Sequence, residues 1–157
     1  MLQAEHREDQ VPVAFETATV RDAMSHGVIS CPPETPLRVV ARMMATYGVH
    51  AIFVFEYGDE DDEATQLWAV VSDLDLVAAT RLDVDTLTAG ATAVTPLVSV
   101  AADSSIAEAG SLMAQYGIAH LAVTEPGSRR PIGVISTLDI ARAIAAGLGP
   151  RETFPSA

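Results

Sequence analysis

Two short segments of the chain combine a serine with an aspartate three residues later, Ser72 with Asp75 and Ser136 with Asp139. An apolar run precedes each serine and a helical pattern follows it, so each pair is expected where a strand turns into a helix. Backbone N–H groups at a helix start attract anions, and a serine hydroxyl there can hold a phosphate oxygen. The aspartate, about one turn further along, can accept hydrogen bonds from both hydroxyls of a ribose.

The same spacing also has a structural interpretation. A serine at a helix start and an acid three residues later form a capping box, in which each side chain accepts a hydrogen bond from the backbone of the other residue. Capping and ligand binding are compatible, so both interpretations stay open for Ser136 and Asp139.

These pairs belong to an internal repeat. Tyr47–Val54 resembles Tyr116–Val123, and Val70–Asp75 resembles Val134–Asp139. Each copy has an extended stretch, a helix ended by glycine, two apolar strands and a second helix. The predicted elements are strand 28–31, helix 37–47, strands 51–55 and 67–71 and a helix from 73, then strand 97–100, helix 106–116, strands 120–124 and 132–135 and a helix from 137. The sequence predicts an α/β (α+β) protein of two β-α-β-β-α units.

The helix starts also have characteristic residues. Glu34-Thr35 and Asp103-Ser104 are typical of residues that precede a helix, and Pro36 suits a first helical position. These features position the two long helices just after the first strand of each copy.

The composition excludes several classes of function. Nine basic against 21 acidic residues give the 157-residue chain a net charge of −12, which repels nucleic acid and anionic membrane surfaces. No apolar run approaches the ~20 residues of a membrane span, and the N-terminus lacks a signal peptide. The single cysteine excludes an internal disulfide and a cysteine-cluster metal site. We expect a cytoplasmic protein without nucleic acid or membrane partners.

The ordered motifs resemble the CBS (cystathionine β-synthase-type) domain, and they occur twice between Val20 and Ala146. The segments that carry the resemblance are Val20–Ser25, Ser30–Leu37, Val94–Val100, Asp103–Ile106, Gly117–Val123 and Gly133–Asp139. Phe53 and Ala122 stand where the family frequently has a proline.

The resemblance implies a tandem pair, with repeats at 20–86 and 87–146 packed by pseudo-twofold symmetry and two clefts between them. A 1–19 extension and a 147–157 tail flank the repeats, so a stand-alone pair is expected. Clefts of this family typically hold AMP, ADP, ATP or S-adenosylmethionine as regulatory ligands, none of them obligatory. Such pairs usually dimerise and regulate a partner protein.

The resemblance also assigns site residues. The principal cleft is expected to contain Gly133, Ser136, Thr137 and Asp139, with Val28, Val49 and Ala51 around the adenine and His120 and His50 beside the phosphates. The second, weaker cleft is expected to contain Ser72 and Asp75.

The two copies differ near these pairs. Gly133 would let a ligand approach the backbone closely, whereas Ala69 stands in its place in the first copy. The first copy also has Asp73 where the second has Thr137. Like charges ~4 Å apart cost on the order of 1 to 4 kcal/mol. We expect the second-copy cleft to bind nucleotides better, and the first-copy cleft to stay empty or take an uncharged or cationic adenosyl ligand.

Two functions remain open from the sequence. One is a nucleotide-sensing module that modulates a partner, and the other is a dimerisation or interaction module with degenerate, empty clefts. No metal site and no catalytic set is expected, because Gly-x-Ser-x-Gly and a phosphate-loop lysine are both absent. A surplus apolar helix face, at Val39, Val40, Met43 and Met44 together with helix 138–146, predicts a homodimer.

Overall fold

The computed structural model of the protein describes residues 17–56 and 66–146. The helices are α2 (Val20–Ala23), α3 (Leu37–Tyr47), α4 (Asp73–Ala79), α5 (Ala89–Thr92), α6 (Ile106–Tyr116) and α7 (Thr137–Ala146). The strands are β1 (Ser25–His26), β2 (Ser30–Cys31), β3 (Ala51–Glu56), β4 (Gln66–Ser72), β5 (Thr95–Pro96), β6 (Ser99–Ala101), β7 (His120–Thr124) and β8 (Pro131–Ser136). The tail at 147–157, and the extension at 1–19 except its last three residues, lie outside the described residues.

The long helix and the central strands of each repeat lie where the sequence predicts them. α3 and α6 have the predicted bounds, and β3, β4, β7 and β8 differ from them by one residue at most. Both helices end at a left-handed glycine, Gly48 at φ 64° and Gly117 at φ 63°, a conformation that costs glycine little. The α/β fold with two β-α-β-β-α units is confirmed.

The helix starts differ in detail from the prediction. Pro36 is the N-cap of α3 rather than its first helical residue. The cap of α6 is Ser105, whose side chain accepts a hydrogen bond from the backbone N–H of Glu108. Asp103 and Ser104 precede this cap, as the sequence predicts, and Ser105 is the N-cap because a serine three residues before Glu108 can reach its N–H.

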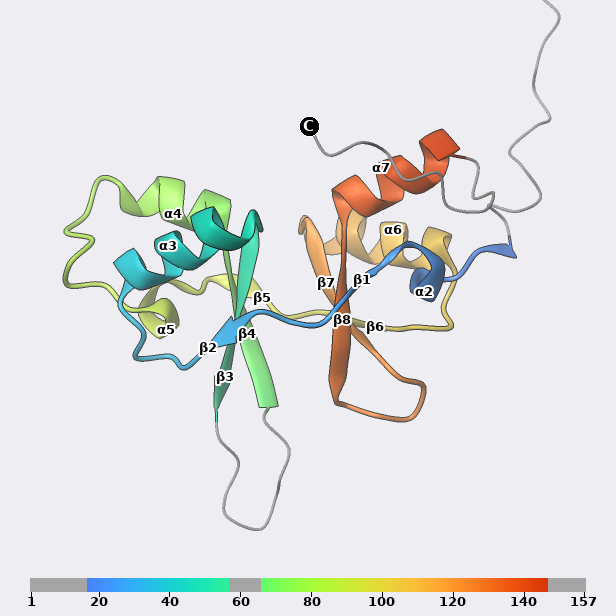
Figure 1. Cartoon of the computed structure of the whole chain (residues 1–157), viewed down its shortest axis with the longest axis horizontal. Helices are drawn as coiled ribbons and strands as arrows, with labels where there is room; N and C mark the ends of the chain where they lie inside the picture. Colours follow the sequence, from blue (N-terminus) through green and yellow to red (C-terminus); the bar gives the residue numbers. More distant parts are fainter. Residues whose placement is uncertain (1–16, 57–65, 147–157) are drawn as a thin grey trace, which may run out of the picture.

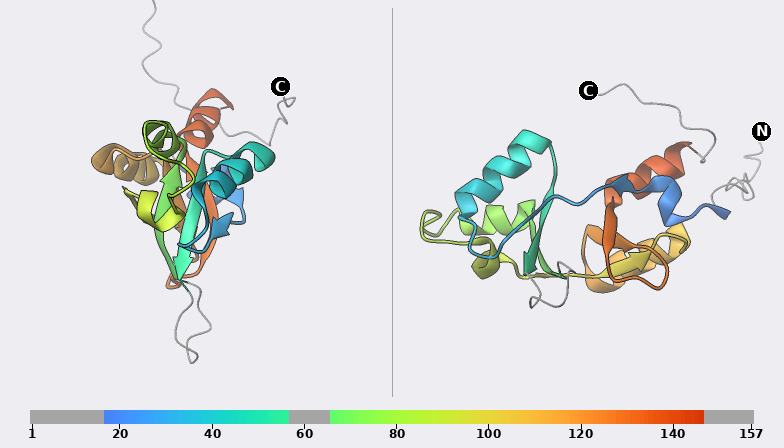
Figure 2. Two further views of the ribbon diagram at one scale, coloured as in Figure 1. Left: turned by 90° about the vertical axis from the view of Figure 1, so that its left-hand side faces the viewer. Right: turned by 60° about the horizontal axis from the view of Figure 1, so that its bottom comes forward.

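Each four-stranded sheet has one edge strand that comes from the segment before the other repeat. β1 precedes the first repeat but lies in the sheet of the second, and β5 precedes the second repeat but lies in the sheet of the first. The strand orders are β2-β3-β4-β5 and β1-β8-β7-β6. Figure 1 shows the blue N-terminal segment running from the right-hand sheet to the left-hand one, and a second view shows the same crossing (Figure 2). Val20–His26 therefore belongs structurally with the second repeat, although its sequence opens the first. The repeat bounds 20–86 and 87–146 stay a prediction based on sequence similarity.

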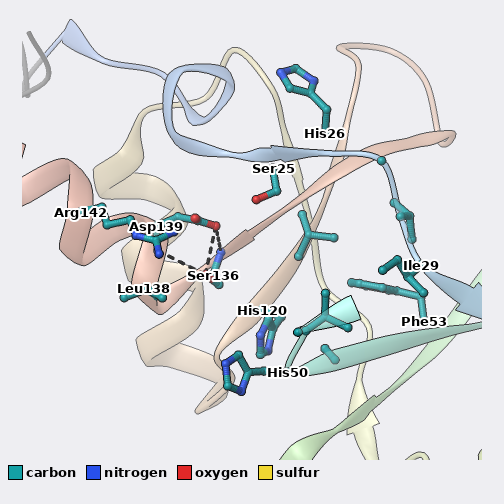
Figure 3. Close-up of a pocket in the computed structure, with 16 residues that line it drawn as sticks. Ser25, His26, Ile29, His50, Phe53, His120, Ser136, Leu138, Asp139 and Arg142 are labelled. Carbon is teal, nitrogen blue, oxygen red and sulfur yellow. Dashed lines mark hydrogen bonds between the residues drawn. The ribbon is translucent and has the colours of Figure 1, made fainter. Parts of the chain in front are cut away.

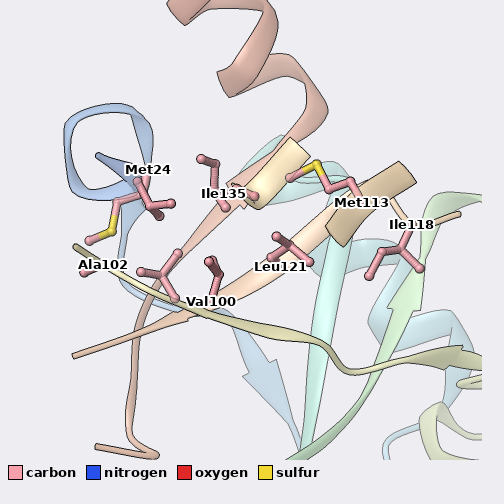
Figure 4. Close-up of a cluster of buried hydrophobic side chains, with 10 residues drawn as sticks. Met24, Val100, Ala102, Met113, Ile118, Leu121 and Ile135 are labelled. Carbon is pink, nitrogen blue, oxygen red and sulfur yellow. The ribbon is translucent and has the colours of Figure 1, made fainter. Parts of the chain in front are cut away.

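Clusters of buried apolar side chains hold this arrangement together. One core surrounds α3 and its sheet, and a second surrounds α6 and includes Val20 and Met24 from the N-terminal segment (Figure 4). A third cluster joins the two sheets through β3, β4 and β7. Its buried members are Ala51, Phe53, Val70 and Ala122. The repeats consequently share a core, and the functional cleft lies beside it.

The surplus apolar surface differs from the sequence-based expectation. Val40 and Met44 are buried in the first core, so these two cannot contribute to an exposed face. The rest of the expected face is partly exposed, at Val39 on α3 and at Leu138 and Ile144 on α7, and α4 adds Leu74 and Val77. The other large apolar side chains that are exposed in the described residues are Tyr47, Leu82, Val94 and Tyr116. Within the described residues, no helix is long and apolar enough to cross a membrane.

Candidate ligand-binding cleft

A cleft of about 450 Å³ opens between the two repeats on the side of Asp139 (Figure 3). Its wall combines the connection 25–29, the start of β3, and the β8–α7 turn. The lining residues are Ser25, His26, Gly27, Val28, Ile29, Gly48, Val49, His50, Ala51, Phe53, His120, Val134, Ser136, Leu138, Asp139 and Arg142. This volume lies within the range of small-molecule sites, which are typically 300–1,000 Å³.

Asp139 contributes a buried carboxylate to the wall of the cleft, with only 9% of the residue exposed. Its Oδ2 accepts hydrogen bonds from the Ser136 backbone N–H at 2.8 Å and the Ser136 hydroxyl at 3.0 Å. The Asp139 N–H donates to Ser136 Oγ at 3.2 Å. The capping box is therefore present. In the described part of the chain Asp139 Oδ1 makes no hydrogen bond, so the capping residue still has an oxygen that can accept from a ligand.

Arg142 supplies a permanent cation at the same place. It lies on α7 one turn after Asp139, lines the cleft and is exposed. The sequence analysis did not include it among the site residues. Its three-residue spacing from Asp139 was the available signal, because residues three apart share a helix face. At the matching position of α4, three residues after Asp75, the chain has Ala78.

Two histidines lie next to each other at the centre of the cleft (Figure 3). His50 Nδ1 lies 2.9 Å from Asp73 Oδ2. The half-buried His120 is the cross-strand neighbour of Ser136. Burial lowers the pKa of His120 below its ordinary value, and nearby His50 lowers it further, while the carboxylates of Asp73 and Asp139 oppose this shift. His120 is therefore predominantly neutral at pH 7.

Asp73 has a partner that the sequence did not indicate. Its carboxylate faces His50, which lines the cleft of Asp139. Asp73 thus orients a histidine of the Asp139 cleft, because a hydrogen bond between carboxylate and imidazole fixes the ring. The expected effect of the Asp73 charge on a phosphate in the cleft of Asp75 stays a prediction.

Seven of the expected residues of the principal cleft line it together, and two do not. Those that line it are Val28, Val49, His50, Ala51, His120, Ser136 and Asp139. Thr137 is exposed and outside the lining. Gly133 is also outside it, because it pairs with His26 across β1 and β8. A Cβ at Gly133 would lie 2.2 Å from the Ser25 carbonyl oxygen, so the glycine permits the approach of β1 rather than of a ligand.

The pair Ser72 and Asp75 forms the same capping box in the first repeat. Asp75 Oδ2 accepts from the Ser72 N–H at 2.8 Å, and in addition from the Thr95 hydroxyl at 3.1 Å. Each aspartate therefore accepts two hydrogen bonds through Oδ2, and the second donor differs: it is the Ser136 hydroxyl at Asp139 and the Thr95 hydroxyl at Asp75. The expected asymmetry between the clefts stays a prediction.

Four further lining residues could not be predicted from the sequence, for a topological reason. Ser25, His26, Gly27 and Ile29 enter the wall because β1 crosses to the second sheet. A repeat alignment contains no signal for this exchange. In the described segments, no group of three or more His, Cys, Asp or Glu side chains is arranged to hold a metal ion.

Comparison with known proteins agrees with this architecture. The CBS domain family matches residues 20–81 and 90–146. Hypoxic response protein 1 of Mycobacterium tuberculosis is 30% identical over 127 residues, which are 79% of this chain and 83% of that protein. A crystal structure of hypoxic response protein I with two coordinated zinc ions superposes with a TM-score of 0.61 at 30% identity, over 80% of this chain and 98% of that one.

Two further structures share the fold. A CBS domain protein from Pyrobaculum aerophilum complexed with AMP, PAE2072, has a TM-score of 0.67 at 23% identity and covers 82% of this chain and 99% of its own. The CBS domain pair of protein MJ0100, in complex with 5′-methylthioadenosine and S-adenosyl-L-methionine, has a TM-score of 0.66 at 18% identity over 80% and 98% of the chains. Two family matches along one chain, with two interlocked β-α-β-β-α units around a shared core, place this protein in the CBS domain family as a tandem pair.

Proposed function

We propose that the cleft of Asp139 binds an adenosine ligand that carries a phosphate, and that binding modulates a partner protein. AMP, ADP and ATP are the candidates whose phosphates suit the positive charge of Arg142 in the cleft. S-adenosylmethionine carries a positive sulfonium group and would instead suit the negative charge of Asp139. The single observation that carries the proposal is the buried Asp139 in the wall of the cleft, one helical turn before Arg142, which lines the same cleft.

Each part of such a ligand has a matching part of the wall. Asp139 can accept hydrogen bonds from ribose hydroxyls, and Ser136 with the start of α7 suits an anion. Val28, Val49 and Ala51 supply apolar surface for an adenine. The AMP complex of PAE2072 and the methylthioadenosine complex of MJ0100 support the choice of an adenosine ligand, since both proteins have this fold.

A thermal-shift screen tests this proposal. At 100 times its Kd a ligand adds about 2.7 kcal/mol of stability, which corresponds to a rise in Tm of roughly 5–10 °C for a domain of this size. AMP, ADP, ATP and S-adenosylmethionine are compared with GMP as the control for a purine without adenine. A rise with adenosine ligands supports sensing, and no rise with any of them at millimolar concentration contradicts it.

A homodimer belongs to this proposal. Support comes from exposed apolar side chains on two helices, Leu74 and Val77 on α4 and Leu138 and Ile144 on α7. Exposed apolar surface of this kind favours association, and a twofold dimer is the commonest closed assembly. The cytoplasmic location stays a prediction, as does the partner protein, and we assign no catalytic step to the cleft.

The second candidate is an interaction module whose clefts stay empty. The observation that favours it is the Asp75 side, where Ala78 stands at the position that Arg142 has in the second repeat. This observation concerns one cleft only, so the two candidates differ in what they expect at Asp139. Binding of any adenosine ligand there separates them.

A further inference from the structure

The centre of the cleft holds a histidine that the proposed binding of ribose and adenine does not use. His120 opens β7, and the β7–β8 register places it directly opposite Ser136. Residues directly opposite each other project to the same face of a sheet, so the imidazole stands beside the serine that is proposed to hold phosphate. The structurally equivalent neighbour of Ser72 is Ala51, which has no titratable group.

The groups that face His120 make its charge responsive to a ligand. They are His50 from the start of β3, Asp73 from α4 and Asp139 from α7. Burial lowers the His120 pKa, with an added contribution from His50, and the two carboxylates oppose this without cancelling it. Asp73 is already hydrogen-bonded to His50. Arg142 and His26 also line the cleft, but the His26 ring points away from His120 (Figure 3).

We infer that the protonation state of His120 depends on the charge of the ligand. The imidazole takes up a proton when a phosphate-bearing adenosine compound enters the cleft, and it stays neutral when the ligand is uncharged. An anion beside the imidazole favours the imidazolium form, and the cost of burial is then offset by a charge-assisted hydrogen bond. This inference rests on the proposed function, and it adds a specificity element that depends on pH.

The direction of the pH dependence follows from the linkage between proton binding and ligand binding. If the pKa of His120 rises when the anion binds, the complex holds more protons than the free protein, so affinity for the anion increases as the pH falls. The phosphate of AMP has its second pKa near ~6, and its own protonation would weaken binding at low pH. A preference for AMP that grows as the pH falls from 8 to 7 must therefore come from the protein. Adenosine lacks the phosphate and serves as the internal control.

The test is calorimetric titration of the full chain with AMP and with adenosine, at pH 7 and 8, in buffers of different ionisation enthalpy. The buffer dependence of the heat gives the number of protons taken up. For AMP we expect the complex to take up about half a proton or more at pH 7. The ratio of AMP affinity to adenosine affinity should decrease several-fold, at most about tenfold, for each unit by which the pH is raised. Adenosine should bind without proton uptake.

His120→Gln should lose the uptake and flatten the pH dependence of the ratio, while keeping a hydrogen-bonding side chain. The control variant Arg42→Gln, at an exposed position of α3 outside the cleft lining, should retain the uptake. Thermal unfolding of each variant shows that it folds. AMP binding without proton uptake, or uptake that survives in His120→Gln, overturns this inference and leaves the proposed function standing. Failure of both AMP and adenosine to bind overturns the two together.

Discussion

Gly133 and Ser25 touch through their backbones: a Cβ added to Gly133 would lie 2.2 Å from the Ser25 carbonyl oxygen and 3.3 Å from Met24 Cε. This contact holds β1 on the edge of the second sheet, where it pairs antiparallel with β8. The segment that follows β1 forms one wall of the cleft. A single glycine in the second repeat thus determines the position of residues that open the first.

Gly133→Ala is expected to destabilise the protein by about 1–3 kcal/mol, because the Ser25 backbone must move to admit the methyl group. Ligand affinity should fall as well, since the wall moves with β1. Thermal unfolding and AMP titration measure the two effects.

Gly110→Ala is the matched control. Gly110 lies inside α6, and a Cβ there meets only Ile140 Cδ1 at 3.9 Å, an ordinary contact. Alanine in a helix interior is favoured over glycine by about 0.5–1 kcal/mol, so this variant should gain stability. An equal loss in both variants would contradict the role given to the Gly133–Ser25 contact.

Arg142→Gln should weaken AMP or ATP binding by about tenfold or more, because a hydrogen bond to a charged group contributes about 1.5–3 kcal/mol. Adenosine binding should change little, since the phosphate is the group that Arg142 is proposed to hold. Titrations with the two ligands measure the difference. Arg42→Gln, at an exposed position of α3 outside the cleft lining, is the control and should bind both ligands as the wild type does.

The sequence was sufficient to predict the repeat, the bounds of the two long helices α3 and α6, and seven of the residues that line the cleft. Gly48, Gly117 and the two Ser–Asp pairs are local signals, and local signals determine where helices begin and end. The exchange of β1 and β5 between sheets could not be predicted, because strand pairing across repeats leaves no local pattern. For the same reason the sequence predicted that Gly133 makes room for a ligand, whereas it makes room for β1.

The homodimer can be tested through its proposed surface. Sedimentation at micromolar concentration should show a species of twice the 16.5 kDa chain mass. Val77→Glu with Ile144→Glu should shift it toward the monomer, because burying unpaired carboxylates in an apolar interface is unfavourable. The control is Val94→Glu, an exposed apolar position outside α4 and α7. A wild type that sediments only as the monomer would refute the dimer.

The central claim is that Asp139 anchors an adenosine ligand, and a comparison of Asp139→Ala with Asp75→Ala tests it most directly. Both aspartates are capping-box residues with 9% exposure, so both variants should lose a similar amount of stability, about 1 kcal/mol. Calorimetric titration with AMP should separate them. We predict that Asp139→Ala weakens binding by about one to two orders of magnitude and that Asp75→Ala changes it little. Equal losses in the two variants, or no binding heat from the wild type at millimolar AMP, would contradict the account.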